Sequence, residues 1–166
     1  AVCKDHGARF IHISTDYVFD GNARSPYKES DPVSPVNIYG ASKLSGEKEA
    51  LHFNPSSVIV RTSWVYSSYG KNFVKTMVKL MKERKELSVV IDQLGSPTYA
   101  ADLADALLAI AVSENFFPGI FHYSNEGVIS WHEFATEIAS LIHADCVIHP
   151  IPTSEFPTPA KRPAFS

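Results

Sequence analysis

The chain has few of the residues that form a disulfide framework or a metal site. Its 166 residues include two cysteines, Cys3 and Cys146, which lie far apart and form no CxxC pair. Isolated cysteines of this kind favour reduced thiols in a cytosol. The seven histidines have no carboxylate or thiol neighbours at the spacing of metal ligands. We therefore expect neither a disulfide nor a bound metal.

An excess of basic residues and long apolar runs are also missing. The chain has 15 Lys and Arg residues against 18 Asp and Glu residues, and its formal net charge is -3. Binding to a nucleic-acid backbone needs a basic stripe, so nucleic acid is not an expected partner. No apolar run approaches the roughly 18 residues of a membrane span, and no signal-peptide pattern opens the chain. These absences predict a cytoplasmic protein that does not bind a membrane.

A glycine-rich phosphate-binding loop is the third absence. The eight glycines form no GxGxxG or GxxGxxG pattern. In dinucleotide-binding proteins this loop precedes the first helix of the fold, and the amides at that helix N-terminus hold the pyrophosphate. The first residue is Ala1, and a strand-like run begins at Phe10. We therefore expect the chain to be the carboxyl-terminal portion of a longer protein.

The sequence does contain a strand–helix–strand pattern. Residues 10–14 and 57–62 are short runs rich in β-branched residues, typical of strands buried in a parallel sheet. Residues 38–51 predict the crossover helix between them, beginning near Asn37. Such a crossover makes the strands parallel, so their carboxyl ends meet at the edge where open α/β sheets bind ligands. The residues at this edge are Thr15, Asp16, Tyr17, Ser63 and Trp64.

Further elements follow along the chain. Apolar spacing predicts helices over 72–84 and 101–112, with Met77 and Met81 in the core, and another helix behind the Ser130–Glu133 capping box. Short strands are predicted at 87–91, 119–123 and 147–149.

Tyr39 and Lys43 lie four residues apart near the start of the predicted crossover helix, so they share one face of it. A phenol is a poor proton shuttle at neutral pH unless a nearby cation stabilises the phenolate. Lys43 is such a cation. The YxxxK pair is common by chance, but here it follows a strand that ends at Thr15, whose hydroxyl can bond the same carbonyl oxygen. The pattern indicates proton transfer to a carbonyl group.

Seven motifs carry a family resemblance. They are ISTDYVFDG at 13–21, YGASKLSGE at 39–47, RTSWVY at 61–66, KNFVKTM at 71–77, DQLGSPTYAADLA at 92–104, GIFHYSNEG at 119–127 and KRPAFS at 161–166. With them the chain resembles, over practically its whole length, the dTDP-4-dehydrorhamnose reductases of the extended short-chain dehydrogenase/reductase family. The resemblance implies an α/β fold: the later part of a Rossmann-like parallel sheet with crossover helices, plus a small substrate-binding α/β subdomain.

The same resemblance implies reduction of a dTDP-sugar, dTDP-4-dehydro-L-rhamnose, with hydride from NADPH (or NADH). Tyr39 would be the general acid, Lys43 would stabilise its phenolate and hold the nicotinamide ribose, and Thr15 would orient the substrate carbonyl. The implied cofactor-binding residues are Ser14, Tyr39, Lys43 and Ser63. The implied substrate-binding residues are Thr15, Asp16, Tyr17, Trp64, Asn72 and Arg162.

Several of these residues also have purely structural explanations. Asp16 could cap a turn, and Asn72 could cap a helix. Trp64 and Tyr17 could be packing residues near a strand end. Arg162 could clamp a diphosphate with two hydrogen bonds, or simply be an exposed side chain.

We expect one unit over residues 1–166. In it, residues 1–70 and 87–112 mainly form the cofactor sheet with the catalytic helix, and residues 71–86 and 113–166 mainly bind the substrate. The strand at 10–14 would have a free edge, and such an edge invites pairing in a homo-oligomer or between fragments.

Two other functions stay open. One is a different nucleotide-sugar reductase or epimerase that uses the same Tyr39 and Lys43. The other is a non-catalytic binding module such as the regulatory subunit of methionine adenosyltransferase. The intact set of Thr15, Tyr39 and Lys43 favours the enzyme, although we expect the chain alone to be inactive.

Overall fold

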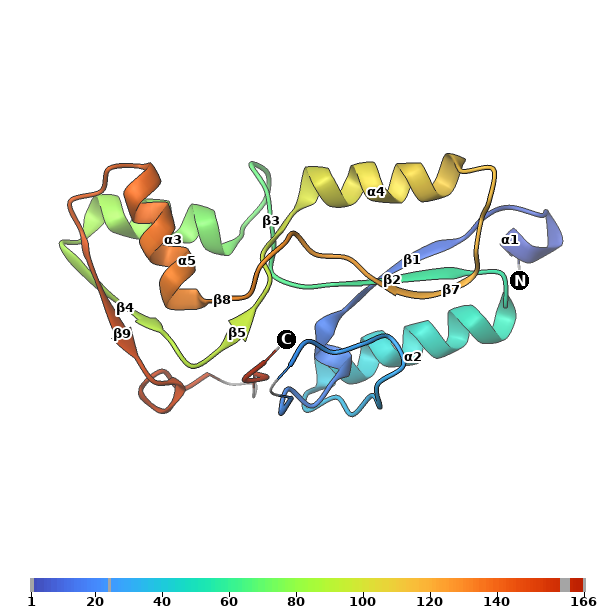
Figure 1. Ribbon diagram of the computed structural model, residues 1–166, viewed down its shortest axis with the longest axis horizontal. Helices are drawn as coiled ribbons and strands as arrows, with labels where there is room; N and C mark the ends of the chain where they lie inside the picture. Colours follow the sequence, from blue (N-terminus) through green and yellow to red (C-terminus); the bar gives the residue numbers. More distant parts are fainter. Residues whose placement is uncertain (1, 24, 159–161, 166) are drawn as a thin grey trace.

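The fold has two groups of elements at opposite ends of an elongated molecule (Figure 1). The computed structural model describes residues 2–23, 25–158 and 162–165. One end holds a parallel sheet with the helices α2 (Ile38–Phe53) and α4 (Ala100–Val112) on its two faces. The other end holds α3 (Phe73–Glu83), α5 (Trp131–Leu141) and a second parallel sheet.

The first sheet has the strand order β1–β2–β7. Its strands are β1 (Ile11–Thr15), β2 (Val58–Thr62) and β7 (Gly119–His122), and all run parallel. Every residue of the central strand β2 is buried. Because Thr15 pairs with Thr62, both strands end side by side, as the strand–helix–strand pattern predicts.

Local sequence signals set the limits of α2 and α4. The Asn37 side chain accepts a hydrogen bond from the Gly40 amide at the start of α2, and the helix ends at Asn54. On the opposite face, α4 places Leu103, Leu107 and Ile110 against Val58 and Val60 of β2. The predicted crossover helix and the helix at 101–112 are therefore both confirmed.

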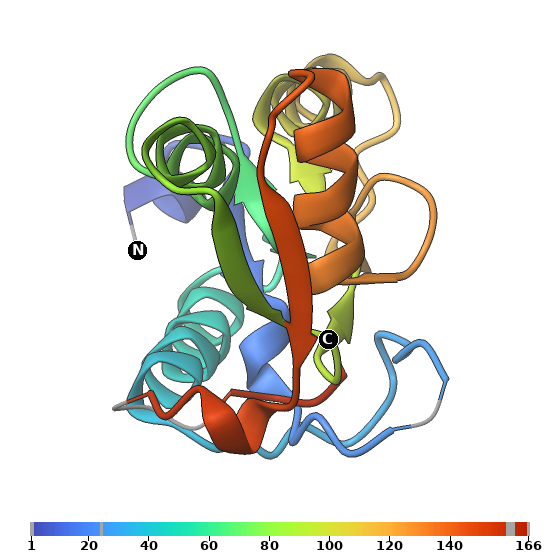
Figure 2. The same ribbon diagram turned by 90° about the vertical axis from the view of Figure 1, so that its left-hand side faces the viewer.

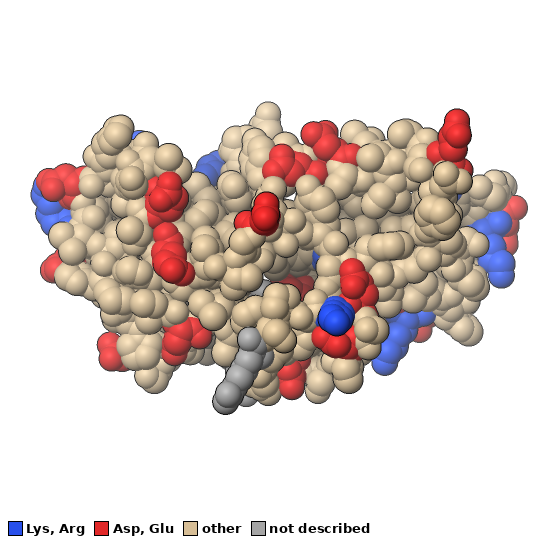
Figure 3. Space-filling model, viewed as in Figure 1, with Lys and Arg blue, Asp and Glu red and all other residues tan. Residues whose placement is uncertain are grey.

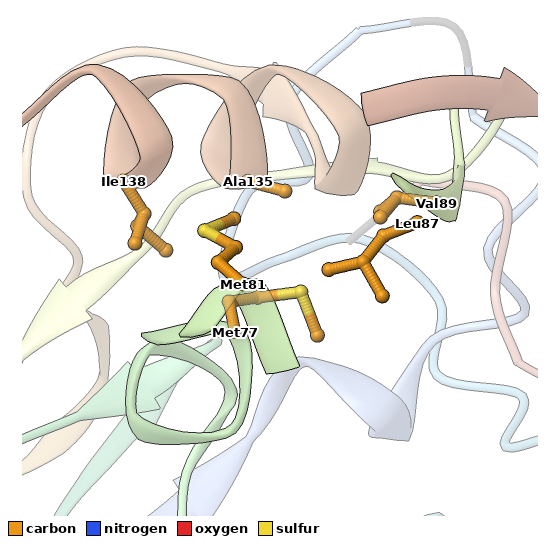
Figure 4. Packing of buried hydrophobic residues seen from close by; sticks show 6 residues of the cluster. All are labelled: Met77, Met81, Leu87, Val89, Ala135 and Ile138. Carbon is orange, nitrogen blue, oxygen red and sulfur yellow. The ribbon is translucent and has the colours of Figure 1, made fainter. Parts of the chain in front are cut away.

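The second group forms its own apolar core. The strands β4 (Glu86–Val90) and β9 (Val147–Ile151) pair in parallel, and α3 and α5 pack together on one side of them (Figure 2). Met77 and Met81 of α3 meet Ala135 and Ile138 of α5 and Leu87 of β4 (Figure 4). The capping box of Ser130 and Glu133 is present at the start of α5, and the predicted core role of both methionines is confirmed.

Two strands belong to different sheets from those expected when the chain was divided into a cofactor part and a substrate-binding part. β4 was expected in the cofactor sheet, yet it pairs with β9; β7 was expected in the substrate-binding part, yet it extends the sheet of β1 and β2. Both are short apolar runs, and such a run specifies that it is buried but not which strand it pairs with. β9 also continues through Pro150, which the two-stranded sheet tolerates because one side of β9 has no strand partner among the described residues.

Short elements join the two groups. β3 (Val65–Tyr66) pairs with β6 (Thr98–Tyr99), and β5 (Leu94–Gly95) pairs with β8 (Ile129–Ser130). The remaining short helices are α1 (Val2–Asp5), η1 (Asp16–Val18) and η2 (Thr153–Glu155). Lys161 and Ser166, the ends of the last sequence motif, lie outside the described residues. Within the described ranges, no helix has both the length and the apolar character to cross a membrane.

Candidate active site

A cavity of about 870 Å³ opens at the carboxyl ends of β1 and β2. It collects most of the residues that the sequence singles out for chemistry. Those that line it are Ser14, Thr15, Asp16, Tyr17, Tyr39, Lys43, Trp64 and Arg162. The edge predicted from the strand–helix–strand pattern is therefore where the structure places this cavity.

Thr15 ends β1 and caps the short helix η1. Its hydroxyl accepts a hydrogen bond from the Tyr17 amide at 3.3 Å and donates one to Asp16 Oδ1 at 2.8 Å. Asp16 thus lies inside η1 and its carboxylate accepts the Thr15 hydrogen bond, while Thr15 itself is the cap. The pair holds the Thr15 hydroxyl at the cavity wall, where a substrate oxygen can compete for it.

Tyr39 and Lys43 lie on successive turns of α2, Tyr39 against Tyr17 of η1 and Lys43 against Ile13 of β1. The Tyr39 ring is 53% exposed and meets the Tyr17 ring edge-on, with centroids 5.7 Å apart. The Lys43 ammonium donates a 2.6 Å hydrogen bond to the Ile13 carbonyl. Gly40 between them allows this approach, because a Cβ there would lie 2.0 Å from the Tyr17 carbonyl oxygen.

The surroundings of the cavity shift two nearby pKa values. Burial, and then the Asp16 charge, raise the pKa of Tyr17, so this phenol stays protonated at neutral pH. Burial, and then the Lys43 charge, lower the pKa of His12 on β1. His12 is therefore neutral at neutral pH and adds no second cation beside Lys43.

Trp64 and Trp131 form a stacked pair in the cavity wall. Their ring centroids are 3.5 Å apart with an interplanar angle of 8°, and both side chains line the cavity. Trp64 adopts a left-handed backbone conformation with φ of 47°, which turns the chain after β2. The sequence pattern of α5 gave no signal of this role for Trp131, because its partner comes from a distant segment.

Two predicted site residues lie away from this cavity. Ser63 donates from its hydroxyl to the Ser96 carbonyl at 2.7 Å and lines a smaller adjoining cavity of about 180 Å³, whose wall shares Asp16 and Thr62 with the first. Asn72 caps α3, since its Oδ1 accepts from the Lys75 amide at 3.0 Å. Its Nδ2 donates to the Ser67 carbonyl at 2.7 Å. The structural explanation of Asn72 is thus confirmed, and the ligand roles of both residues stay predictions.

Another cavity lies beyond the stacked tryptophans. It measures about 990 Å³ and is lined by residues of α3, β4 and β9. Trp131 and Arg162 line both cavities, so they mark the boundary between the two. Of the described residues, no group of three or more His, Cys, Asp or Glu side chains is arranged to hold a metal ion.

The parallel sheets and their covering helices make the chain a mixed α/β protein, with Tyr39 and Lys43 on α2 at the cavity. Comparison with known proteins identifies the family within this class. The model of the RmlD substrate binding domain matches residues 1–166. The chain belongs to this family.

Individual relatives agree with this assignment. The chain is 48% identical over 160 residues to the spore coat polysaccharide biosynthesis protein SpsK of Bacillus subtilis, covering 96% of this chain and 56% of that protein. A dTDP-4-dehydrorhamnose reductase structure from Clostridium acetobutylicum superposes with a TM-score of 0.95 at 47% identity, over 100% of this chain and 58% of that one. The corresponding reductase of Bacillus anthracis, solved in complex with NADP, gives a TM-score of 0.92 at 46% identity, over 96% and 56%. The chain therefore spans a little over half the length of these relatives.

Proposed function

We propose that this chain carries the catalytic and substrate-binding part of an NADPH-dependent reductase that converts dTDP-4-dehydro-L-rhamnose into dTDP-L-rhamnose. The observation that carries the proposal is the meeting of Thr15, Tyr39 and Lys43 at one cavity on the edge of a parallel sheet. The family match and the names of the solved relatives support the same reaction.

The three side chains divide the work at the sugar carbonyl. Tyr39 donates its phenolic proton to the oxygen at C4 of the sugar as the carbonyl becomes a hydroxyl. Lys43 stabilises the phenolate that remains. Thr15 donates a hydrogen bond from its hydroxyl to the same oxygen in place of the one it makes to Asp16, and this hydrogen bond orients the carbonyl.

NADPH, when bound, supplies the hydride that adds to C4. The cavity fits its nicotinamide end, because a Lys ammonium has three donors and Lys43 uses one of them on Ile13. Two donors remain for ribose hydroxyls, and Ser14 lies in the same wall. Ser63, in the smaller adjoining cavity, belongs to the proposal as a second cofactor contact. The chain contains no glycine-rich loop, so we expect the chain alone to bind NADPH weakly and to be inactive.

The adjoining cavities of about 870 and 990 Å³ suit the two halves of a nucleotide sugar. The hexose would lie between Tyr39 and the Trp64 side of the tryptophan stack, with Asp16 and Tyr17 beside it. Arg162, on the boundary of both cavities, would bind the diphosphate. The nucleoside would then lie over α3 and β4, at the end of the helix that Asn72 caps.

The proposed division of labour follows the two groups of elements. The β1–β2–β7 sheet with α2 serves the cofactor and the chemistry, and the group of α3, α5, β4 and β9 serves the nucleotide sugar. β1 pairs only with β2 among the described residues, so its other edge can accept a strand of a second copy or of another segment. We place the protein in the cytoplasm, where the free thiols of Cys3 and Cys146 remain reduced.

The test is an assay of the complete gene product with NADPH and dTDP-4-dehydro-L-rhamnose. We expect one NADPH to be oxidised for each dTDP-L-rhamnose formed. Conversion of the nucleotide sugar without net oxidation of NADPH would instead indicate an epimerase. Tight binding of the nucleotide sugar without turnover would indicate a binding module. Calorimetric titration of the chain alone should show weak NADPH binding, and a dissociation constant in the low micromolar range would contradict the expected need for further residues.

A further inference from the structure

Glu47 is a buried carboxylate on the same helix as Tyr39 and Lys43. Its side chain is 2% exposed, and it lines none of the three cavities of about 870, 180 and 990 Å³ described above. Tyr39, Lys43 and Glu47 are spaced four residues apart, so all three lie along one face of α2. The face that presents the proposed acid to the cavity therefore ends in a buried charge.

The Glu47 carboxylate binds both strands of the βαβ unit. Arg61 of β2, itself 4% exposed, donates to it through Nε at 2.9 Å and Nη2 at 2.7 Å. Ser14 of β1 donates its hydroxyl hydrogen to the same carboxylate. Since Lys43 holds Ile13 one turn earlier, α2 is attached to two successive residues of β1, and Thr15 is the next one.

Arg61 extends this cluster to the turn that follows β1. Its guanidinium lies over the ring of Phe19, 5.1 Å from the ring centroid, and Phe19 is buried just after η1. The carbonyl of Tyr17, inside η1, contacts the first turn of α2 at Gly40 so closely that a Cβ would not fit. A small shift of α2 along β1 therefore has to move Tyr39 relative to both Tyr17 and Thr15.

Stability alone does not account for this pair. A buried ion pair pays a large desolvation cost, and apolar residues of similar volume in its place are often neutral or stabilising for the fold. Contacts between apolar side chains, however, do not fix the orientation of a helix against a strand. Two parallel N–H···O bonds fix both distance and orientation between a helix and a strand.

We propose that Glu47 and Arg61 are positioning residues, which set the register of α2 against β1 and β2 and thereby place the Tyr39 phenol relative to Thr15. This inference rests on the proposed reductase function. Neither residue lines the cavity that holds Tyr39, Lys43 and Thr15, so neither touches the sugar in this scheme. Their loss therefore lowers the rate of the chemical step more than it lowers binding.

The decisive variant replaces both partners with apolar residues, Glu47→Met together with Arg61→Met, in the complete gene product. We expect its melting temperature to stay at or above that of the wild type, while kcat falls by about 10–100-fold, as for reacting groups displaced by about 1 Å. The KM for the dTDP-sugar should change by less than about threefold, because neither side chain lines the cavity that holds Tyr39. A folded double variant with kcat within about twofold of the wild type overturns the inference.

Two further variants separate register from stability. Ile138→Val in the distant apolar core should lower the melting temperature and leave kcat unchanged. If the double variant fails to fold, Glu47→Asp takes its place, since it keeps the charge but is one methylene shorter. It should also lower kcat more than it changes KM, and an unchanged kcat overturns the inference equally.

Failure of the proposed function has a different signature, namely a wild-type protein without NADPH-dependent turnover. In that case a crystal structure of the double variant decides the matter. The inference predicts that the Lys43–Ile13 hydrogen bond and the edge contact of Tyr17 with Tyr39 are lost or shifted. If both are retained, the inference is wrong whatever the substrate.

Discussion

Both ends of the molecule have apolar cores, but the end built on β1, β2 and α2 also buries the ion pair of Glu47 and Arg61, whereas the core cluster of the other end consists of apolar side chains such as Met77, Met81 and Ile138. Apolar contacts are non-directional and depend mainly on the area removed from water. Charge-assisted hydrogen bonds fix orientation as well as distance. The comparison indicates that geometry is held most strictly where the proposed proton transfer takes place.

The charged residues on the surface show no comparable difference between the two ends. On the face shown in Figure 3, Lys and Arg side chains are scattered among Asp and Glu side chains along the whole molecule. The ion pair of Lys85 and Asp145, at the end of the apolar core, is 84% and 92% exposed. Such exposed pairs contribute little to stability. The difference between the ends therefore lies in their interiors.

The largest effect should follow from Tyr39→Phe at the catalytic end. Removing the phenolic proton should lower kcat by about 10²–10⁴-fold, the usual contribution of a general acid. The ring still packs against Tyr17, so the Kd for the dTDP-sugar should stay nearly constant. Steady-state kinetics and calorimetry measure both, with Tyr69→Phe, 84% exposed, as the matched control. More than half of the wild-type turnover in Tyr39→Phe would exclude Tyr39 as the acid.

Ile138→Ala should produce the next largest effect, and at the other end. Removing most of a buried isoleucine side chain costs about 2–5 kcal/mol of unfolding free energy. Denaturant unfolding followed by circular dichroism measures it, and Leu141→Ala on the same helix, 70% exposed, is the control. Equal losses for the two variants would contradict the placement of the core between α3, α5 and β4.

Trp64→Ala tests the boundary between the two ends. Losing its aromatic surface should cost about 1–3 kcal/mol of binding and raise the KM for the dTDP-sugar about tenfold or more, with NADPH affinity nearly unchanged. Trp131→Ala should act in the same direction, because Trp131 supports the Trp64 ring. A fall in melting temperature with parallel losses for both ligands would instead make Trp64 a packing residue.

Ser130→Ala should have the smallest effect. It removes the hydroxyl that accepts from the Glu133 amide and leaves the capping box at the start of α5 incomplete. Loss of a helix cap costs about 1 kcal/mol, or a fall of about 2–4 °C in melting temperature for a protein of this size. Differential scanning calorimetry measures the fall, and Ser140→Ala near the end of the same helix is the control. A rise in the KM for the dTDP-sugar would show that the cap also positions Trp131.

Sequence patterns were sufficient where the signal is local. The βαβ unit follows from two β-branched runs with a helix between them, and the parallel direction of its strands brings Thr15 to the edge where Tyr39 and Lys43 lie. The caps at Asn37, Asn72 and Ser130 were equally readable, because a cap needs only one side chain within three residues of an amide.

Contacts between distant segments were not readable in this way. The stack of Trp64 on Trp131 joins residues far apart in the chain, and neither helical nor strand periodicity identifies such partners. The same is true of the pairing of β4 with β9.

The sequence by itself determined the long helices, the main strands, the helix caps and the shared face of Tyr39 and Lys43, because each depends on backbone geometry within a few residues. Only the tertiary structure decided which strand pairs with which, that the tryptophans stack, and that the carboxylate of Glu47 binds Arg61 and Ser14 at once. Those choices depend on where the whole chain can bury apolar area and satisfy buried polar groups together, and no local pattern encodes that solution.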